Sequence, residues 1–283
     1  MNEFPHRNGF ALHADLQHPV LNRYLRLCRE EDELLMGGQR FDWSRQWEYP
    51  YILANLPEDG LDRRILDAGS GYRFFTPLLA RRGFDVDACD LDAGIGPKYD
   101  EIAAQYDLSI EFTQQDLANL TYPADRFDHI CCISVLEHTR DPAAILREFH
   151  RCLKVGGTLL LTFDVSIRGD RDIPVANARA LVEQLERAFT PVTPFADRAL
   201  FDPDRLAESE AVLQTAWFRR YHPELLPWRF ISRAGLRNLL RGRIGRPFFD
   251  LTVVGLVLRK DAQEPPGPDS SSDPSGPADA SGA

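Results

Sequence analysis

Four short apolar runs in this chain are each followed by a turn rich in acids, glycine or histidine. The four turns are Asp67-Ala68-Gly69-Ser70-Gly71, Asp90-Leu91, Asp116-Leu117 and Ser134-Val135-Leu136-Glu137-His138. Glycine lets the backbone pass close to a ligand, a carboxylate accepts hydrogen bonds from hydroxyl and amine groups, and histidine takes up a proton near neutral pH. Such a turn after each run predicts a ligand-binding rim.

The elements that position these turns alternate between strand and helix. Strands are predicted over residues 65–66, 86–89, 110–113, 127–133, 158–163 and 251–258. Helices are predicted over residues 16–36, 76–82, 97–106 and 178–189, and from Pro142, with Asp141 as N-cap, to Gly156-Gly157. This alternation is typical of an α/β fold with a doubly wound, mostly parallel sheet, in which ligands bind outside the carboxyl ends of the strands.

Five segments are expected along the chain. They are an N-terminal helical or lid region (1–62), a cofactor-binding α/β core (63–194), an inserted cap for the substrate (195–247), a last core strand (248–260) and a disordered tail (261–283). The tail consists of Pro, Gly, Ser, Ala and acids apart from one Gln. Such a composition buries too little apolar surface to offset the entropy of ordering.

The composition argues against several classes of protein. A net charge of −10 argues against nonspecific nucleic-acid binding. No apolar run reaches the length of a membrane-spanning helix, and the N-terminal residues lack the apolar stretch of a secretory signal. Five cysteines without a C-x-x-C pair suggest neither a disulfide framework nor a zinc module. We expect a cytoplasmic protein without an integral membrane segment.

The first turn discriminates between two kinds of nucleotide cofactor. A dinucleotide site favours G-x-G-x-x-G, but Phe74 stands where the third glycine belongs. A bulky residue there argues against the close approach of helix and strand that glycine allows. The turn that begins with Asp67 instead suits a ligand with a positive charge and no phosphate.

Five motifs, taken in order, resemble those of the class I S-adenosylmethionine-dependent methyltransferases. They are Ile65-Leu66-Asp67-Ala68-Gly69-Ser70-Gly71, Asp90, Asp116-Leu117, Phe127-Asp128 with Val135-Leu136-Glu137-His138, and Leu153-Lys154-Val155-Gly156-Gly157-Thr158-Leu159-Leu160. The resemblance covers about residues 63–165. It points to the ubiquinone-type, small-molecule branch, which carries a Leu-Glu-His element. It implies a Rossmann-like fold and S-adenosyl-L-methionine as cofactor.

The same resemblance implies a set of cofactor contacts. Asp67, Gly69 and Gly71 would line the methionine part, Asp90 would hold the ribose, and Asp116 and Leu117 would contact the adenine. Beyond the resemblance, Leu91 and Ser134, which follow the second and fourth strands, and Arg45 are further candidate cofactor contacts.

His138 and Glu137 are the candidate catalytic residues. Methyl transfer to a hydroxyl needs a group that accepts the hydroxyl proton, and His138 lies just past the fourth strand, where the methyl group is expected. The alternative is that His138 only braces this turn through a hydrogen bond to its own backbone. Some ubiquinone-type relatives bind a divalent metal through the Glu-His pair and a Glu three residues before it. Ser134 stands at that position, so no metal is expected.

Residues 41–51 are rich in aromatic side chains and allow two interpretations. The first is a segment that packs a helix onto the sheet. The second is a lid, in which Arg45 pairs with the cofactor carboxylate while Trp47 and Tyr49 exclude water. In the second case Tyr49 would also contact the substrate.

Arginine is concentrated in residues 217–246, where eight arginines accompany a single acid. Guanidinium groups bind phosphate and carboxylate, and aromatic rings stack on sugars, so Trp217, Arg219, Arg220 and Tyr221 are candidate substrate contacts. Residues 232–244 predict a basic amphipathic helix that also suits peripheral contact with an anionic membrane. An ordinary solvated face is the alternative for most of these arginines.

Together these features predict a methyltransferase with a small-molecule substrate. We expect O-methylation of an anionic sugar, a glycan precursor or a natural-product hydroxyl. An N-methyltransferase and a non-catalytic cofactor-binding partner protein are alternatives, and Phe74 disfavours a nicotinamide dehydrogenase.

Overall fold

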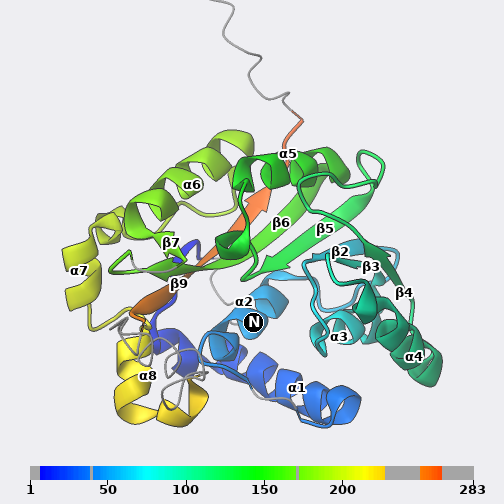
Figure 1. Cartoon of the computed structure of the whole chain (residues 1–283), viewed down its shortest axis with the longest axis horizontal. Helices are drawn as coiled ribbons and strands as arrows, with labels where there is room; N and C mark the ends of the chain where they lie inside the picture. The colour runs from blue at the N-terminus through cyan, green and yellow to red at the C-terminus, as the bar shows by residue number, and fades with distance from the viewer. Residues whose placement is uncertain (1–6, 39–40, 170–171, 227–248, 263–283) are drawn as a thin grey trace, which may run out of the picture.

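The computed structural model describes residues 7–38, 41–169, 172–226 and 249–262 (Figure 1). Its α-helices are α1 (Pro19–Met36), α2 (Arg45–Asn55), α3 (Phe75–Arg81), α4 (Gly96–Tyr106), α5 (Pro142–Cys152), α6 (Val175–Ala188), α7 (Pro203–Glu208) and α8 (Thr215–Tyr221). Its strands are β1 (Gly9–Phe10), β2 (Arg64–Ala68), β3 (Asp85–Asp90), β4 (Ile110–Gln114), β5 (Phe127–Ile133), β6 (Leu153–Ser166), β7 (Ile173–Pro174), β8 (Thr190–Pro191) and β9 (Leu251–Arg259). Short 3-10 turns are η1 (His13–Gln17), η2 (Ala93–Ile95), η3 (Leu136–His138), η4 (Arg198–Phe201) and η5 (Pro223–Leu225).

One sheet runs through the middle of the molecule, with the strand order β1-β9-β6-β5-β2-β3-β4. Strands β2 to β6 pair in parallel, whereas β9 is antiparallel to β6. The chain builds outward from β2 in one direction through β3 and β4, and in the other through β5 and β6. The order therefore reverses between β2 and β5, which is where ligands bind in open α/β sheets. The predicted mostly parallel, doubly wound sheet is confirmed.

Helices cover both faces of the sheet, because successive side chains of a strand point to opposite sides. In β5, Ile130 and Cys132 belong to the apolar cluster that contains α5 and α6. The alternate residues Cys131 and Ile133 belong to the cluster that contains α1, α2 and α3. Figure 1 shows α5 and α6 on one side of the sheet and α1 to α4 on the other. Burial on both faces explains why this strand is a continuous apolar run.

The aromatic segment of residues 41–51 contributes most of α2, which lies against the sheet. Trp47 and Tyr51 are buried and stack with their ring centroids 4.4 Å apart. A Cβ atom on Gly255 of β9 would lie only 2.5 Å from the Trp47 ring, so glycine permits this close approach of helix and strand. Packing on the sheet, rather than a lid, is therefore the role of Trp47.

The helix that begins at Pro142 ends at Cys152 and not, as predicted, at the Gly156-Gly157 pair. Leu153 is already the first residue of β6. The main chain of the two glycines hydrogen-bonds with Lys260, which directly follows β9. The glycines therefore serve strand pairing rather than the end of the helix.

Part of the predicted cap (195–247) packs on the sheet. Phe195 and Phe201 lie against Phe10 of β1, with ring centroids 5.8 and 5.3 Å from it. Strand β1 itself, which pairs with β9, is too short for the sequence pattern to indicate. The basic helix predicted over 232–244 and the tail from residue 263 lie outside the described residues. Within the described ranges, no helix is long and apolar enough to cross a membrane.

Candidate functional site

The turns after β2 and β3 are tied together at the carboxyl edge of the sheet. The Gly69 N–H donates to the Cys89 carbonyl oxygen at 2.9 Å. The Gly71 N–H donates to Oδ2 of Asp90 at 3.0 Å, and the Asp92 N–H donates to Oδ1 of Asp90 at 3.1 Å. Each carboxylate oxygen keeps a lone pair, so Asp90 is held in place and can still accept from two ligand hydroxyls.

Gly69 and Gly71 form a cradle for a ligand. Both have left-handed backbone conformations, with φ of 72° and 53°. A Cβ atom on Gly69 would lie 2.6 Å from Cγ2 of Val135, in the turn after β5. The space beside Gly71 is open, since the nearest heavy atom to an added Cβ is Cγ of Arg73 at 4.0 Å. The turn is closed on its protein side and open on the other, which fits the methionine part of S-adenosylmethionine.

Asp67 supports this cradle through a buried polar network. Its Oδ2 accepts a hydrogen bond from the Thr76 hydroxyl at 2.6 Å, and that hydroxyl lies 2.8 Å from the hydroxyl of Tyr99. Tyr99 in turn donates to the Gly71 carbonyl oxygen at 2.6 Å. Burial raises the pKa of Asp67 to about 6. The network connects β2, α3 and α4 to the glycine turn and fixes its shape.

The predicted adenine contacts differ in their exposure. Leu91 is 69% exposed directly after β3 and offers apolar surface beside Asp90. Asp116 is exposed and accepts the Ala118 N–H at 3.0 Å. The Leu117 side chain is buried in the core cluster that contains α5 and α6. Leu91 and Asp116 are therefore accessible to a ligand, and Leu117 contributes packing.

A buried polar cluster, which we call the acidic cluster, lies at the ends of β5 and β6. Its centre is Glu48 of α2, which is fully buried. One carboxylate oxygen accepts from the hydroxyls of Ser134 at 2.5 Å and Thr162 at 2.7 Å, and the other pairs with Arg45. Glu48 therefore orients Ser134 and Arg45, two of the predicted cofactor contacts.

Glu137 and Asp164 complete the acidic cluster. The Asp164 N–H donates to Oε1 of Glu137 at 3.2 Å. Oε2 of Glu137 and Oδ1 of Asp164 are shielded from solvent and have no hydrogen-bond partner among the described residues. Burial, reinforced by neighbouring carboxylates, raises the pKa of Glu137 to about 8 and that of Asp164 well above its usual range. A carboxyl group shifted in this way is suited to accept a proton near neutral pH.

His138 lies beside Glu137 on the outer side of the same turn. Its side chain is exposed, and its backbone N–H donates to the Val135 carbonyl oxygen at 2.9 Å. Bracing of the turn needs a hydrogen bond from the imidazole to the main chain, and none is formed within the described part of the chain. The imidazole is thus open to a ligand.

Arg45 and Tyr49, on α2, lie close to the glycine turn. With Arg73 they line a cavity of ≈ 60 Å³ whose wall also contains Asp32 and Asp42. A guanidinium group suits a carboxylate ligand, but Arg45 is already paired with Glu48 and two acids share this wall, so the cavity gives less support to such a contact. Tyr49 is only 6% exposed, so it contributes mainly to the packing of α2.

The candidate substrate residues of α8 are at the same edge of the sheet. Leu251, at the start of β9, pairs with Ser166 at the end of β6, and its N–H donates to the hydroxyl of Thr215 at 2.9 Å. Because Thr215 is the first residue of α8, this contact fixes the helix beside the carboxyl end of β6.

The four candidates on α8 have different surroundings. Trp217 is half-buried among other aromatic rings. Arg219 forms an ion pair with Asp250 at 3.0 Å. Arg220 lies over the ring of Tyr221, 5.3 Å from its centroid, and Tyr221 is 54% exposed. Arg220 and Tyr221 are therefore the more accessible pair.

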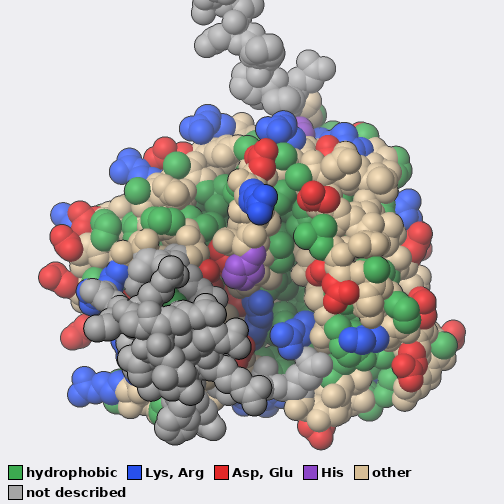
Figure 2. All heavy atoms as spheres, viewed as in Figure 1, with side chains coloured by type: hydrophobic (Ala, Val, Ile, Leu, Met, Phe, Trp, Pro, Cys, Tyr) green, Lys and Arg blue, Asp and Glu red, His purple; other side chains and the backbone are tan. Residues whose placement is uncertain are grey.

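The space-filling view shows a hollow in the middle of the face that is turned toward the viewer, with acidic, basic and histidine side chains gathered in it (Figure 2).

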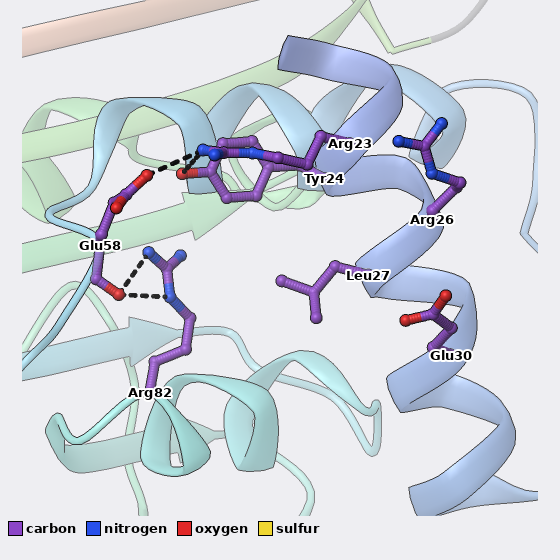
Figure 3. Close-up of a pocket in the computed structure, with 7 residues that line it drawn as sticks. All are labelled: Arg23, Tyr24, Arg26, Leu27, Glu30, Glu58 and Arg82. Atoms are coloured by element: carbon purple, nitrogen blue, oxygen red, sulfur yellow. Dashed lines mark hydrogen bonds and ion pairs between the residues drawn. The ribbon is translucent and has the colours of Figure 1, made fainter. Parts of the chain in front are cut away.

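A second, basic pocket of ≈ 430 Å³ is separate from this edge (Figure 3). Arg23 and Arg82 both point toward Glu58, with Arg23 bonded to its carboxylate at 2.9 Å and Arg82 to its carbonyl oxygen at 2.9 Å. Glu58 precedes β2 and Arg82 precedes β3, so this pocket lies toward the amino ends of the strands. It does not belong to the candidate site.

Comparisons with known proteins identify the domain that carries this site. Residues 66–161 match the family model described as a methyltransferase domain. A ubiquinone biosynthesis O-methyltransferase of Coxiella burnetii is 32% identical over 100 residues, which are 35% of this chain and 43% of that protein. One from Xanthomonas axonopodis pv. citri is 33% identical over 117 residues, which are 40% of this chain and 46% of that protein. The chain thus matches less than half the length of these relatives.

Solved structures show the same fold over most of the chain. The geranyl diphosphate C-methyltransferase of Streptomyces coelicolor A3(2) has a TM-score of 0.52 at 16% identity and covers 91% of both chains. The [4+2]-cyclase SpnF has a TM-score of 0.53 at 20% identity, over 90% of this chain and 99% of that one. Residues 66–161 are therefore a class I methyltransferase domain, with S-adenosyl-L-methionine as the cofactor of that family, which confirms the resemblance drawn from the sequence.

Proposed function

We propose that this chain is an S-adenosylmethionine-dependent methyltransferase that acts on a hydroxyl group of a small molecule. The observation that carries the proposal is the shielded carboxyl group of Glu137, directly after β5, the strand that pairs with β2 and its glycine cradle. Transfer to an un-ionised hydroxyl requires a proton acceptor beside the methyl donor. Similarity to ubiquinone biosynthesis O-methyltransferases supports oxygen as the acceptor atom.

In this proposal the rim of the sheet holds the cofactor. Asp90 accepts hydrogen bonds from the ribose hydroxyls, and the open side of Gly71 admits the methionine part. Leu91 and Asp116 flank the adenine, and Arg45 faces the carboxylate end of the methionine. The fixed turn geometry means that the protein needs little rearrangement to bind, which lowers the cost of orienting the reacting atoms.

The protein's chemical task is removal of a proton. Bound S-adenosyl-L-methionine supplies a methyl group on a positively charged sulfur: the acceptor oxygen forms the C–O bond, the C–S bond breaks, and its electron pair stays on sulfur. Glu137 takes the proton that the hydroxyl loses. His138, exposed beside it, is the second candidate for that proton. Glu48 holds the surrounding donors in place, and burial of the acidic cluster limits the access of water.

We further propose that the acceptor is an anionic sugar, a glycan precursor or a natural product that carries a hydroxyl group. Arg220 over the exposed ring of Tyr221 supports an anionic group on the acceptor, because a guanidinium binds phosphate or carboxylate and a ring stacks on a sugar. Arg219 gives less support, since it is paired with Asp250. The remaining arginines, over residues 229–246, lie outside the described residues.

The test has two steps. Calorimetry should give a dissociation constant for S-adenosylhomocysteine on the order of micromolar and no heat with NAD. The chain is then incubated with methyl-labelled S-adenosylmethionine and a panel of hydroxylated and aminated small molecules, and methylated products are detected by mass spectrometry. Absence of S-adenosylhomocysteine binding would refute the proposal. Methylation of amines alone would favour an N-methyltransferase, and cofactor binding without any transfer would favour a non-catalytic partner protein.

A further inference from the structure

A pocket of ≈ 440 Å³ lies between the turn after β5 and the start of α6. Its wall is mixed, with Leu136, Ile173 and Leu181 as apolar residues and Glu137 and Asn177 as polar ones. A concave site with apolar walls and a few polar groups is typical of small-molecule binding. The described residues that line it come from this turn, from the start of α5, from Asp172 and β7, and from α6, and none come from α8.

Glu137 belongs both to this pocket and to the acidic cluster. Its Oε2 and Oδ1 of Asp164 are shielded from solvent and lack a partner among the described residues. By contrast, both oxygens of Glu48 are occupied by hydroxyl and guanidinium donors of the protein. A buried hydrogen-bond acceptor without a partner destabilises the folded state by about 1–3 kcal/mol. A ligand that donates a hydrogen bond to such an oxygen would remove this penalty.

The charge of this region selects the kind of donor. In the described part of the chain, the three carboxyl groups of the acidic cluster are accompanied by the single guanidinium of Arg45. The pocket wall adds two further acids, Asp141 and Asp172, against Arg140. At a pH where Glu137 is ionised, an anionic ligand group would place like charge beside a shielded carboxylate, which is unfavourable. An uncharged hydroxyl avoids this repulsion and supplies the missing hydrogen bond.

We infer that this pocket is the acceptor site, and that it binds an uncharged hydroxyl on a small apolar framework and rejects a carboxylate. The hydroxyl donates to Glu137, whose Oε2 turns from its shielded position toward the pocket to accept it, and Oδ1 of Asp164 is a second acceptor in the shielded region. The inference rests on the proposed function and narrows it: the reacting group is an alcohol or a phenol rather than an acid. Any anionic group of the acceptor then lies at the end of the molecule opposite the reacting hydroxyl.

Benzyl alcohol and benzoate are matched probes, because they share a ring and differ in charge. The full chain is saturated with S-adenosylhomocysteine, and binding of each probe is measured by saturation-transfer NMR. Burial raises the pKa of Glu137 to about 8, so the measurement is made at about pH 9, where Glu137 is ionised. We expect benzyl alcohol to bind and benzoate to bind at least about tenfold more weakly, because of like-charge repulsion.

Two variants connect this selectivity to the acidic cluster. Glu137→Gln and Asp164→Asn each remove an ionisable group at nearly constant size, and we expect at least one to reduce the benzoate penalty to about threefold. Glu183→Gln is the matched control, since Glu183 is on α6 but outside the pocket and pairs with Arg179 at the surface. It should keep the wild-type selectivity.

Equal binding of the two probes to the wild-type chain, or no binding of benzyl alcohol, would overturn the inference. A benzoate penalty that persists in both variants would also overturn it. If neither variant folds, the wild-type selectivity decides the question alone. The probes are also measured without S-adenosylhomocysteine, whose own binding is recorded in the same samples. If S-adenosylhomocysteine does not bind, the proposed function is wrong. If S-adenosylhomocysteine binds but the probes do not show the expected selectivity, only the assignment of the acceptor site is wrong.

Discussion

The Gly71 N–H donates to the carboxylate of Asp90 at 3.0 Å, so the turn after β2 is anchored to the acid at the end of β3. The same carboxylate is the proposed partner of the ribose hydroxyls. In this proposal one side chain both shapes the cradle and contacts the ligand.

Replacing Asp90 by Ala should weaken the binding of S-adenosylhomocysteine by roughly 1–3 kcal/mol, because ribose hydroxyls lose their acceptor and the turn loses its anchor. Calorimetry measures the change. The control is Asp92→Ala, which removes an exposed acid two residues away that caps η2. It should leave the affinity nearly unchanged. Equal affinities of wild type and Asp90→Ala would refute the ribose assignment.

Gly69→Ala should destabilise the fold more than Gly37→Ala does. The two glycines have similar φ, 72° and 69°, so both substitutions incur the left-handed strain of roughly 1–2 kcal/mol. Only at Gly69 does the new Cβ also collide with Val135, which adds about 1–3 kcal/mol of overpacking. Urea denaturation gives both free energies of unfolding. Equal decreases in the free energy of unfolding would show that the turn containing Val135 shifts to accommodate the new Cβ atom without an energetic penalty.

Glu137→Gln should lower turnover about 10²–10⁴-fold while leaving S-adenosylhomocysteine affinity intact, because a positioned base is worth that much. A base must be unprotonated to act. With the pKa of Glu137 raised to about 8, the wild-type rate should rise as the pH increases through that value. His138→Ala is the companion variant and should cost only a few-fold in turnover. The reverse pattern, a large loss for His138→Ala alone, would transfer the role of base to His138.

The stability that Glu137 and Asp67 contribute should be lost as the pH rises from about 5 to about 8. Burial raises the folded-state pKa of Glu137 to about 8 and that of Asp67 to about 6, both above their ordinary values. At these two groups the folded chain binds more protons than the unfolded chain, so raising the pH favours unfolding. His129, whose pKa burial lowers to about 4, has the opposite effect up to about pH 6.5. Glu137→Gln should make the decline shallower, and Glu183→Gln should not. The free energy of unfolding as a function of pH measures both. A slope unchanged by Glu137→Gln would contradict the raised pKa.

The sequence predicted the strand ends and their turns because these are local patterns. An apolar run followed by Asp67 or Asp90 can be recognised within ten residues or so. The acidic cluster could not be predicted in that way, since Glu48 is separated by 86 residues from Ser134 and by 114 from Thr162. One signal was available: Asp164 is an acid that follows the predicted strand 158–163, like the acids after the earlier strands.

Side-chain direction accounts for the remaining differences. Leu117 was predicted to contact the cofactor and is buried in the core, while its neighbour Asp116 is exposed. Adjacent residues in a turn share a position in the sequence but not a direction in space. The aromatic segment illustrates the same limit, because both packing and a lid require aromatic side chains. The presence of Gly255 opposite Trp47 distinguished them, and that pairing is visible only in three dimensions.

Packing of Trp47 and Tyr51 on Gly255 has a consequence for folding during synthesis. On the ribosome, α2 emerges long before β9, so Trp47 and Tyr51 lack their contact with Gly255 until nearly the whole described chain has been made. Strand β1 likewise waits for β9, its pairing partner. The nascent chain therefore exposes an apolar surface for much of its translation, which favours association with chaperones. Release of residues 251–259 from the exit tunnel allows β1 to pair with β9 and completes the packing of α2 on the sheet.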